Sequence, residues 1–375
     1  MAKNTTIFTL LQNFISQEEI KGILAEFGFE DTARKCDVST LLAYLVGAAA
    51  FEWKSLRHAA DVAPAQGLKS VDYSTLSKRL GELNYQIVKR IFDMIVSRLN
   101  RVTRRKLERK KGLLAIDSTT ITVGETRLPW ALYHGKRSGI KPHVSFTNST
   151  EMPLKVVETT GLKNDGPIGV QLEDKRFILV ADRAYFSIDK ADRYAQTGQD
   201  FVIRLKENIH LSRKKSLKRA AVEDSNVIGD FTCIIGTKQK QTKRRHRVVE
   251  FVDYEGELVR VVTNRRDVTA EEITDMYKEH WAIESFFRWI KQNLNVPVLF
   301  GTTENAVYSQ LFAALIAYVL LKFLQTECHK KKNCKRLSFA GFTRQLLCDT
   351  LPIEWRIELK EILDFHRKLY QVDIG

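Results

Sequence analysis

Two apolar runs in the middle of the chain each end on an aspartate. Leu113–Ile116 runs into Asp117, and Phe177–Ala181 runs into Asp182. Short apolar runs of this kind, followed directly by polar residues, are typical of strands buried on both faces. A carboxylate at the end of such a strand is costly to bury unless something binds it. Since ligand sites gather at strand ends of α/β sheets, each aspartate is a candidate ligand as well as an ordinary cap or turn former.

Further runs around these two predict an α/β layer rather than a β-sandwich. Strand-like runs occur at Val144–Phe146, Leu154–Thr160 and Phe201–Leu205. A helical spacing of apolar residues over Ile188–Gln196 separates the last of these from Phe177–Ala181. Strands that alternate with helices in this way are typical of α/β domains.

The pattern of charged, strand-like and helix-like residues changes several times along the chain, and these changes predict five segments. After Glu207, two basic bursts at Arg213–Arg219 and Lys238–Arg247 flank short strand candidates, and helical patterns over Thr269–Asn293 and Glu304–Leu324 follow. We expect a helical N-terminal DNA-binding domain (1–105), the first part of an α/β core (106–206) and a β-rich insertion (207–263). The second part of the core (264–328) and a helical C-terminal tail (329–375) complete the chain.

The N-terminal segment has a region suited to DNA. Two short helices expected over Ser55–Val62 and Ser74–Leu83 are joined by a turn with Pro64 and Gly67, as in a helix-turn-helix reader. An ordinary helical bundle with a polar face explains the same pattern, so both interpretations stay open. Residues 101–111 carry seven Lys or Arg and one acid, which suits a domain junction and a track for phosphates.

The charge balance and the cysteines narrow the class of protein. Lys and Arg number 60 against 45 Asp and Glu, a formal net charge of +15, which makes a polyanion the first partner to consider. The five cysteines are scattered without a C-x-x-C pair, so we expect free thiols and no zinc site. The longest apolar run, Leu311–Leu321, is too short to span a bilayer. We therefore expect a cytoplasmic protein with no membrane partner.

The predicted helix over Thr269–Asn293 brings in a third acid. At about 100° per residue, one stripe about 80° wide holds five polar side chains. They are Tyr277, His280, Glu284, Arg288 and Lys291. A solvated face with a Glu284–Arg288 ion pair explains the two charges but not the other three side chains. Two strand-end aspartates and a helix glutamate can hold two divalent cations about 4 Å apart for in-line displacement at phosphorus. Oxygen ligands select Mg²⁺ or Mn²⁺ over zinc.

Three sequence blocks carry a resemblance to a known family. They read LLAIDSTTI, LVADRAYFS and MYKEHWAIESFFRWIK. They resemble the catalytic blocks of the DDE transposases of bacterial insertion sequences, in the family numbered four (the Y-R-E-K class). Its signature is Tyr, two residues, Arg, three residues, Glu, six residues, Lys. Tyr277, His280, Glu284 and Lys291 match every spacing and three of the four identities.

The resemblance implies a fold and a set of site residues. It implies an RNase H-like core, a mixed sheet with flanking helices, interrupted by the β-rich insertion. Asp117, Asp182 and Glu284 would form the catalytic triad that binds two Mg²⁺ ions, for which Mn²⁺ substitutes. Tyr277 and Lys291 would contact DNA phosphates. His280 stands where the family has Arg and is also a predicted phosphate contact, although neutral imidazole lacks the bidentate grip of guanidinium. Arg288, on the same face, is a further predicted contact that would compensate. The remaining predicted phosphate contacts come from the second basic burst: Lys243, Arg244, Arg245 and Arg247.

The resemblance also implies an activity and partners. It implies cut-and-paste transposition, in which the protein binds terminal inverted repeats of double-stranded DNA, nicks the strand, forms a hairpin and transfers the end into target DNA. The expected partner in the synaptic complex is a second copy of the chain, a homodimer, in the bacterial cytoplasm and on the nucleoid when bound. Two alternatives stay open: an RNase H-like nuclease without strand transfer, and a catalytically inactive, domesticated DNA-binding protein. Some relatives stack a flipped base on a Trp of the insertion, but there is no Trp between Trp130 and Trp281.

Overall fold

The computed structural model describes residues 6–104, 111–135, 137–217, 222–293 and 299–371. They form two compact units: the first contains 1–106, 121–139 and 288–375, and the second contains 107–120 and 140–287. The division passes through strand β3 and helix α10, which therefore contribute to both units. Residues 105–110 of the predicted phosphate track and 218–219 of the first basic burst lie outside the described residues. The five-segment division stays a prediction.

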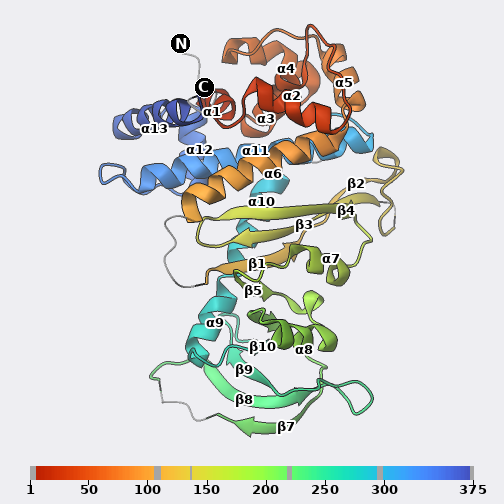
Figure 1. The fold of residues 1–375 in the computed structure, drawn as a ribbon, viewed down its shortest axis with the longest axis vertical. Coiled ribbons are helices and arrows are strands. Elements are labelled where there is room, and N and C mark those ends of the chain that lie inside the picture. The colour runs from red at the N-terminus through yellow and green to blue at the C-terminus, as the bar shows by residue number, and fades with distance from the viewer. Residues whose placement is uncertain (1–5, 105–110, 136, 218–221, 294–298, 372–375) are drawn as a thin grey trace. The chain divides into compact units, whose positions relative to one another are not determined.

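The first unit is helical and is built around one long buried helix. Figure 1 labels its helices: α1 (Thr6–Phe14), α2 (Gln17–Glu26), α3 (Val38–Ala50), α4 (Leu56–Val62), α5 (Tyr73–Glu82), α6 (Tyr85–Arg104), α11 (Glu304–His329), α12 (Phe339–Leu347) and α13 (Ile353–Gln371). The unit also holds β2 (Ile121–Gly124). By length and composition α11 could cross a membrane, but its apolar window is wholly buried. It packs against α3, α6 and α13, as a core helix does.

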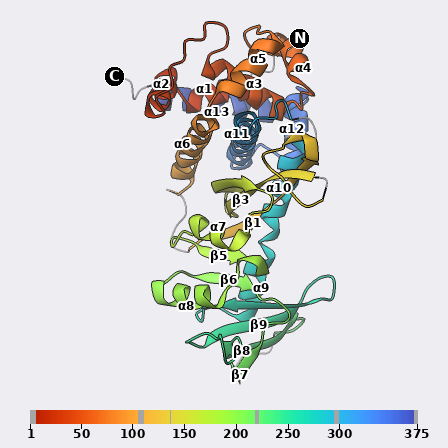
Figure 2. The same cartoon turned by 90° about the vertical axis from the view of Figure 1, so that its right-hand side faces the viewer.

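The second unit contains a mixed sheet, and in Figure 2 its strands follow one another down the view from β3 to β7. Their order is β4-β3-β1-β5-β6-β10-β9-β8-β7. The bounds are β1 (Leu113–Ser118), β3 (Arg137–Thr147), β4 (Met152–Thr160), β5 (Ile178–Ala181), β6 (Phe201–Arg204), β7 (Leu211–Ser216), β8 (Val227–Ile235), β9 (His246–Val252) and β10 (Leu258–Thr263). β1, β5 and β6 run parallel, and β3, β4 and β7–β10 pair antiparallel with their neighbours. The four strands of the predicted insertion extend the sheet beyond β6.

Helices cover both faces of this sheet. Successive side chains of a strand point to opposite faces, and in β5 and β6 both sets are apolar. Leu179 and Ile203 belong to one apolar core, and their neighbours Val180 and Val202 belong to the other. The first core includes residues of α7 (Asp165–Leu172) and α8 (Ile188–Thr197), and the second includes residues of α9 (Ala270–Lys278). The five strands from β4 to β6 have the order and directions of an RNase H-like core. The mixed sheet with flanking helices confirms the predicted fold class.

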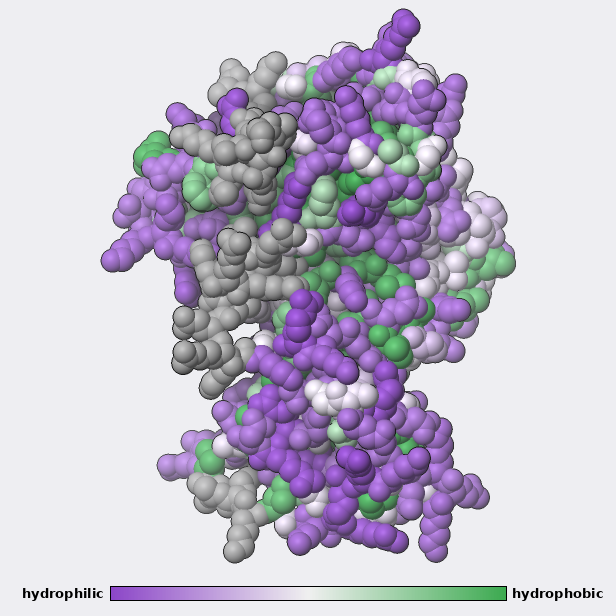
Figure 3. Space-filling view, in the orientation of Figure 1, coloured by the Kyte–Doolittle hydropathy of each residue, from purple (hydrophilic) through white to green (hydrophobic). Residues whose placement is uncertain are grey.

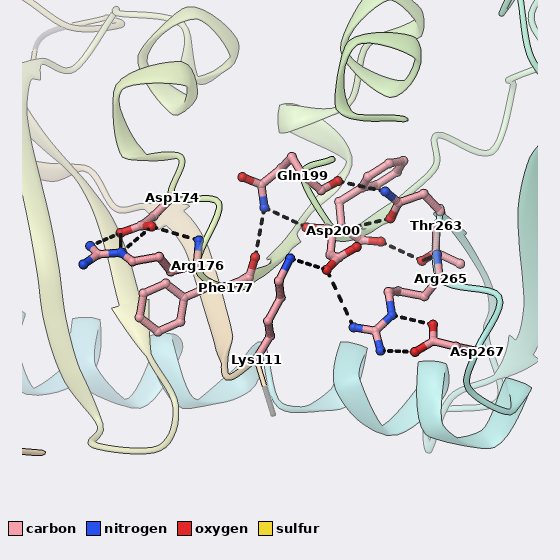
Figure 4. A network of polar contacts seen from close by, with 11 residues as sticks. Lys111, Asp174, Arg176, Phe177, Gln199, Asp200, Thr263, Arg265 and Asp267 are labelled. Carbon is pink, nitrogen blue, oxygen red and sulfur yellow. Dashed lines mark hydrogen bonds and ion pairs between the residues drawn. The ribbon is translucent and has the colours of Figure 1, made fainter. Parts of the chain in front are cut away.

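A polar network ties the amino ends of the parallel strands together (Figure 4). The side-chain amide of Gln199 donates to the carbonyl oxygens of Phe177 and Asp200, 2.9 Å away in each case. The ammonium of Lys111 lies 2.7 Å from the carboxylate of Asp200, and Arg265 lies 3.9 Å from the same group. Because the network fixes where β1, β5 and β6 begin, it also fixes which residues reach the opposite edge of the sheet.

Candidate active site

The two predicted aspartates lie side by side at the carboxyl edge of the sheet. In the parallel pair of β1 and β5, Ile116 is in register with Ala181, so Asp117 and Asp182 each come one residue beyond that pair. Neighbouring strands are about 4.8 Å apart. The backbone N–H of Ser118 donates to the Asp117 carboxylate at 2.8 Å. The rigid register of the sheet therefore brings these two carboxylates together, as the strand pattern indicated.

The predicted glutamate helix is broken into two, which corrects the single stripe expected from the sequence. Helix α9 ends at Lys278, and α10 (Trp281–Asn293) begins after a turn at Glu279–His280. Tyr277 therefore belongs to α9, His280 to the turn and Glu284 to α10. The side-chain amide of Asn148 donates to the carbonyl oxygen of Glu279, which holds the turn.

One cavity of about 530 Å³ contains the three acids. Asp117, Asp182 and Glu284 line it together with Tyr277 and His280. Its other polar and aromatic lining residues were not predicted: Arg204, Phe251, Asp253, Tyr254, Glu255, Lys278 and Trp281. Among the described residues, no three His, Cys, Asp or Glu side chains are close enough together to hold one metal ion. The structure thus gathers the predicted acids around one cavity without drawing them into a closed ligand set.

Arg204 carried a sequence signal that was overlooked. It is the last residue of β6, the third parallel strand, and so ends at the same edge as Asp117 and Asp182. Asp253, Tyr254 and Glu255 lie in the turn between β9 and β10, and only the fold brings this turn to the cavity.

The electrostatics of the cavity favour a cation. Burial raises the pKa of Asp117 to about 7, and the negative charges of Asp182 and Glu284 add to this effect. Burial, with the charge of Asp182, also raises the pKa of Tyr277 to about 12. Negative charge is thus crowded around Asp117 and is costly there unless a positive charge offsets it.

His280 is buried, and this changes its expected chemistry. Only 5% of the residue is exposed, its Nε2 lies 3.4 Å from the carbonyl oxygen of Ile116, and its ring stacks on Tyr277. Burial lowers the pKa of His280, the opposite of the shift that a charged phosphate contact would produce. His280 is therefore built as a neutral ring between α9 and β1.

The second basic burst contains both exposed and buried residues. Lys243 and Arg244 are exposed, and their backbone N–H groups donate to the Asp192 carboxylate at 2.7 and 3.3 Å. Arg245 is half-buried, and its guanidinium donates to the carbonyl oxygen of Thr232 at 2.7 Å. The structure contradicts the expectation for Arg247. Its side chain is buried, and its guanidinium forms an ion pair with the Asp230 carboxylate at 2.9 Å within the sheet.

The remaining predicted contacts belong to the first unit. Arg288 and Lys291 continue α10 as exposed side chains of that unit. In the helix pair α4 and α5, Asp72 caps α5 by accepting from the N–H of Ser74 at 2.8 Å. Arg79 of α5 is half-buried, and its guanidinium lies 2.7 Å from the Asp31 carboxylate, so it is engaged within the unit.

The fold and the cavity define a class of protein. An RNase H-like sheet whose adjacent parallel strands and following helix bring three carboxylates to one cavity is the architecture of enzymes that cut and join nucleic acid strands. The family model described as the transposase DDE domain matches residues 108–320. The chain belongs to this family, the DDE transposases of insertion sequences.

Two relatives, both named as transposases, agree with this membership. The chain is 49% identical over 370 residues to a protein of Geobacillus stearothermophilus named as the probable transposase for insertion sequence element IS5377, covering 99% of this chain and 98% of that one. It is 26% identical to a Synechocystis protein named for insertion sequence element IS4SA, over 78% of this chain and 82% of that one. A solved piggyBac transposase synaptic complex with hairpin DNA matches with a TM-score of 0.48 and 13% identity, over 97% and 85% of the two chains.

Proposed function

We propose that this transposase carries out cut-and-paste transposition at the cavity lined by Asp117, Asp182 and Glu284. The observation that supports the proposal is the meeting of these three carboxylates, two of them from adjacent parallel strands, in one cavity. The reaction sequence is nicking of the transposon end, hairpin formation, hairpin opening and strand transfer. Each step is a phosphoryl transfer with water or a DNA hydroxyl as nucleophile, so no side chain of the protein needs to form a covalent bond.

The residues present fit a pair of divalent cations. All three donors are carboxylates, the ligands preferred by Mg²⁺ and Mn²⁺. Burial is the main cause of the raised pKa of Asp117, and the neighbouring negative charges that add to it are the excess that bound cations would offset. Two bound cations would supply stabilisation of the negative charge that develops on the oxygens in an in-line displacement. The carboxylates do not form a closed set among the described residues, so Asp117, Asp182 and Glu284 would have to come closer together to hold the cations.

The basic residues have separate tasks in this proposal. Arg204 lies in the cavity itself and is suited to the phosphate group that reacts. Lys243, Arg244, Arg288 and Lys291 are exposed, and we assign them to phosphates of the bound DNA. Arg245 keeps this assignment in part, because its guanidinium also bonds to Thr232. The set does not include Arg247. Figure 3 shows hydrophilic side chains over most of the face in view, with hydrophobic residues in smaller patches.

An aromatic pair suits the hairpin step. Tyr254, 71% exposed in the turn between β9 and β10, contacts Trp281 edge to face, with ring centroids 4.7 Å apart. Both rings line the cavity. A base that leaves the helix gains about 1–3 kcal/mol by stacking on an aromatic side chain. We assign this pair to stacking on the base displaced during hairpin formation. The pair would take the role of the insertion Trp of some relatives, which this sequence lacks.

The test is incubation of the protein and Mg²⁺ with labelled DNA that carries the ends of the element. The expected products are nicked ends, hairpins and joined DNA, formed by two copies of the chain on two ends. Nicks without hairpins or joined products would instead identify a nuclease without strand transfer. Binding without any cleavage would identify an inactive DNA-binding protein. The substrate places the activity in the bacterial cytoplasm, at the nucleoid.

A further inference from the structure

The loop between β8 and β9 carries a dense positive charge. This basic hairpin, residues 236–245, reads GTKQKQTKRR and contains no acid. Four of its cations have exposed side chains: Lys238, Lys240, Lys243 and Arg244. Because like charges at this spacing repel one another, contacts from elsewhere in the fold are needed to hold the backbone in one conformation.

The first part of the basic hairpin is fixed by tight local geometry. Gly236 has a φ of +110°, and a Cβ at this position would lie 2.2 Å from the carbonyl oxygen of Lys240. The N–H of Thr242 donates to the carbonyl oxygen of Ile235 at 2.8 Å, and the Thr242 hydroxyl accepts from the N–H of Ile235 at 3.1 Å. A Cβ at Gly236 would also lie 2.7 Å from Ile188 of α8, so the basic hairpin packs directly on that helix.

Asp192 of α8 holds the last part of the basic hairpin. The residue is 7% exposed, and its two carboxylate oxygens accept from the N–H groups of Lys243 at 2.7 Å and Arg244 at 3.3 Å. The Nε2 of His246, at the start of β9, lies 3.0 Å from the same carboxylate. One buried carboxylate therefore fixes the backbone that carries two exposed cations.

Asp192 is ionised in this position. Burial raises its pKa, but the hydrogen bonds from Lys243, His246 and Arg244 outweigh burial and leave the pKa below its usual range. A carboxylate accepts stronger hydrogen bonds than a neutral group does. The acid also adds a negative charge beneath a surface that we assign to phosphates, which disfavours DNA binding unless its hold on the backbone offsets the repulsion.

We propose that Asp192 is a positioning residue for DNA binding, which fixes the backbone of Lys243 and Arg244 so that their side chains present two cations to the phosphates. The inference rests on the proposed function, which assigns these two side chains to the bound DNA. Asp192 itself lies buried beneath the basic hairpin and does not touch DNA. Ordering the backbone of one residue costs the equivalent of about a five- to thirtyfold change in an equilibrium constant, and a backbone fixed in advance avoids that cost on binding.

The experiment measures binding of the full chain to two labelled DNA duplexes, one with an end of the element and one of unrelated sequence, at several salt concentrations. Hydrogen exchange followed by mass spectrometry reports on the backbone in parallel. We expect Asp192→Asn to weaken binding to both duplexes about fivefold, the lower end of the range for one ordered residue, and to speed exchange in the basic hairpin. Electrostatics alone predicts the opposite sign, because the change removes a negative charge near the DNA. Binding as tight as that of the wild type, or tighter, would overturn the inference.

Asp189→Asn is the matched control. Asp189 is an exposed acid one turn before Asp192 on α8, and its carboxylate lies 2.9 Å from the ammonium of Lys240 in the same hairpin. The change removes the same charge from the same helix, at a side chain that contacts the hairpin through an ion pair. We expect unchanged exchange in the basic hairpin and DNA binding equal to or tighter than that of the wild type, because Lys240 is released for phosphates. If both variants weaken binding equally, the hold of Asp192 on the backbone is not the cause, and the inference is wrong.

Lys243→Gln with Arg244→Gln distinguishes failure of this inference from failure of the proposed function. If this double variant binds DNA like the wild type with an unchanged salt slope, the proposed function is wrong about these two cations. If it weakens binding while Asp192→Asn does not, only the positioning role is overturned. Added to the double variant, Asp192→Asn should not weaken binding further, because the residue acts through those two side chains. A further loss of binding there would show that Asp192 merely supports the fold.

Discussion

Arg247 gives the sharpest test of whether a basic residue of the sheet stabilises the fold or contacts DNA. It lies in β9 and is 4% exposed. Its Nε and Nη2 donate to the two carboxylate oxygens of Asp230 on β8, each at 2.9 Å, and Nη1 donates to the carbonyl oxygens of Arg265 and Val268. Every nitrogen of the guanidinium is thus engaged within the protein, and a phosphate would have to displace these bonds.

Replacing Arg247 with Ala should destabilise the second unit strongly. The change leaves the buried Asp230 carboxylate without its cation, and the partly buried carbonyl groups of Arg265 and Val268 without this donor. Removing one partner of a buried ion pair costs about 3–5 kcal/mol. At about 2–4 °C per kcal/mol for a domain of this size, the unfolding temperature should fall by roughly 10 °C. Replacing both partners, Arg247→Met with Asp230→Leu, should recover most of the loss because no charge is left unpaired.

Urea unfolding followed by circular dichroism measures the loss, and DNA binding at several salt concentrations measures phosphate contacts. Arg244→Ala is the matched control, since Arg244 is an exposed member of the same basic burst. It should change stability by no more than about 0.5 kcal/mol and reduce the salt slope of binding by about 0.9. The reasoning is refuted if Arg247→Ala unfolds at the wild-type urea concentration while the salt slope decreases.

Three further predictions concern the site and its DNA. Asp117→Ala, Asp182→Ala and Glu284→Ala should each abolish cleavage and leave binding of the end DNA intact in a gel-shift assay; near wild-type cleavage by any of them would remove that residue from the site. Lys243→Gln with Arg244→Gln should weaken binding to all DNA sequences alike, with a log–log salt slope lower by about 1.8, and an unchanged slope would mean that both charges are simply solvated. His280 is buried with a lowered pKa, so its neutral form is present throughout pH 7 to 9. We expect His280→Arg to lower activity in that range by burying a guanidinium, although Arg is the residue of the family signature. Activity equal to or above the wild type would restore the role of a phosphate contact.

The strand-end acids could be predicted because their signal is local. An apolar run fixes a buried strand, and the residue that follows it is bound to reach the edge of the sheet, so Asp117 and Asp182 needed only their own neighbours in sequence. The same rule would have found Arg204, which ends the third parallel strand. The period-two pattern of a strand would also have placed Arg247 on a buried face. In β9 it shares its face with Val249 and Phe251, which belong to the core beneath α9.

The break between α9 and α10 could not be predicted, because distant residues produce it. The helical pattern continues without interruption from Thr269 to Asn293. The contacts at the turn come from elsewhere: Asn148 bonds to the carbonyl oxygen of Glu279, and the carbonyl oxygen of Ile116 accepts from His280. Such tertiary contacts override local helix propensity. Tyr277 and Glu284, which the sequence pattern places on one helix, therefore lie on two different helices.

This break changes how the three acids can cooperate. Asp117 and Asp182 are held by the register of β1 and β5, so their relative positions follow from the sheet. Glu284 follows the turn on a different element, and Phe286 connects that element to the sheet by packing on Phe146, with ring centroids 5.2 Å apart. A helix can shift on an apolar contact more easily than two hydrogen-bonded strands can slide. In the proposed function, Glu284 would therefore be the acid that completes the ligand set, beside a pair of aspartates whose spacing the sheet sets.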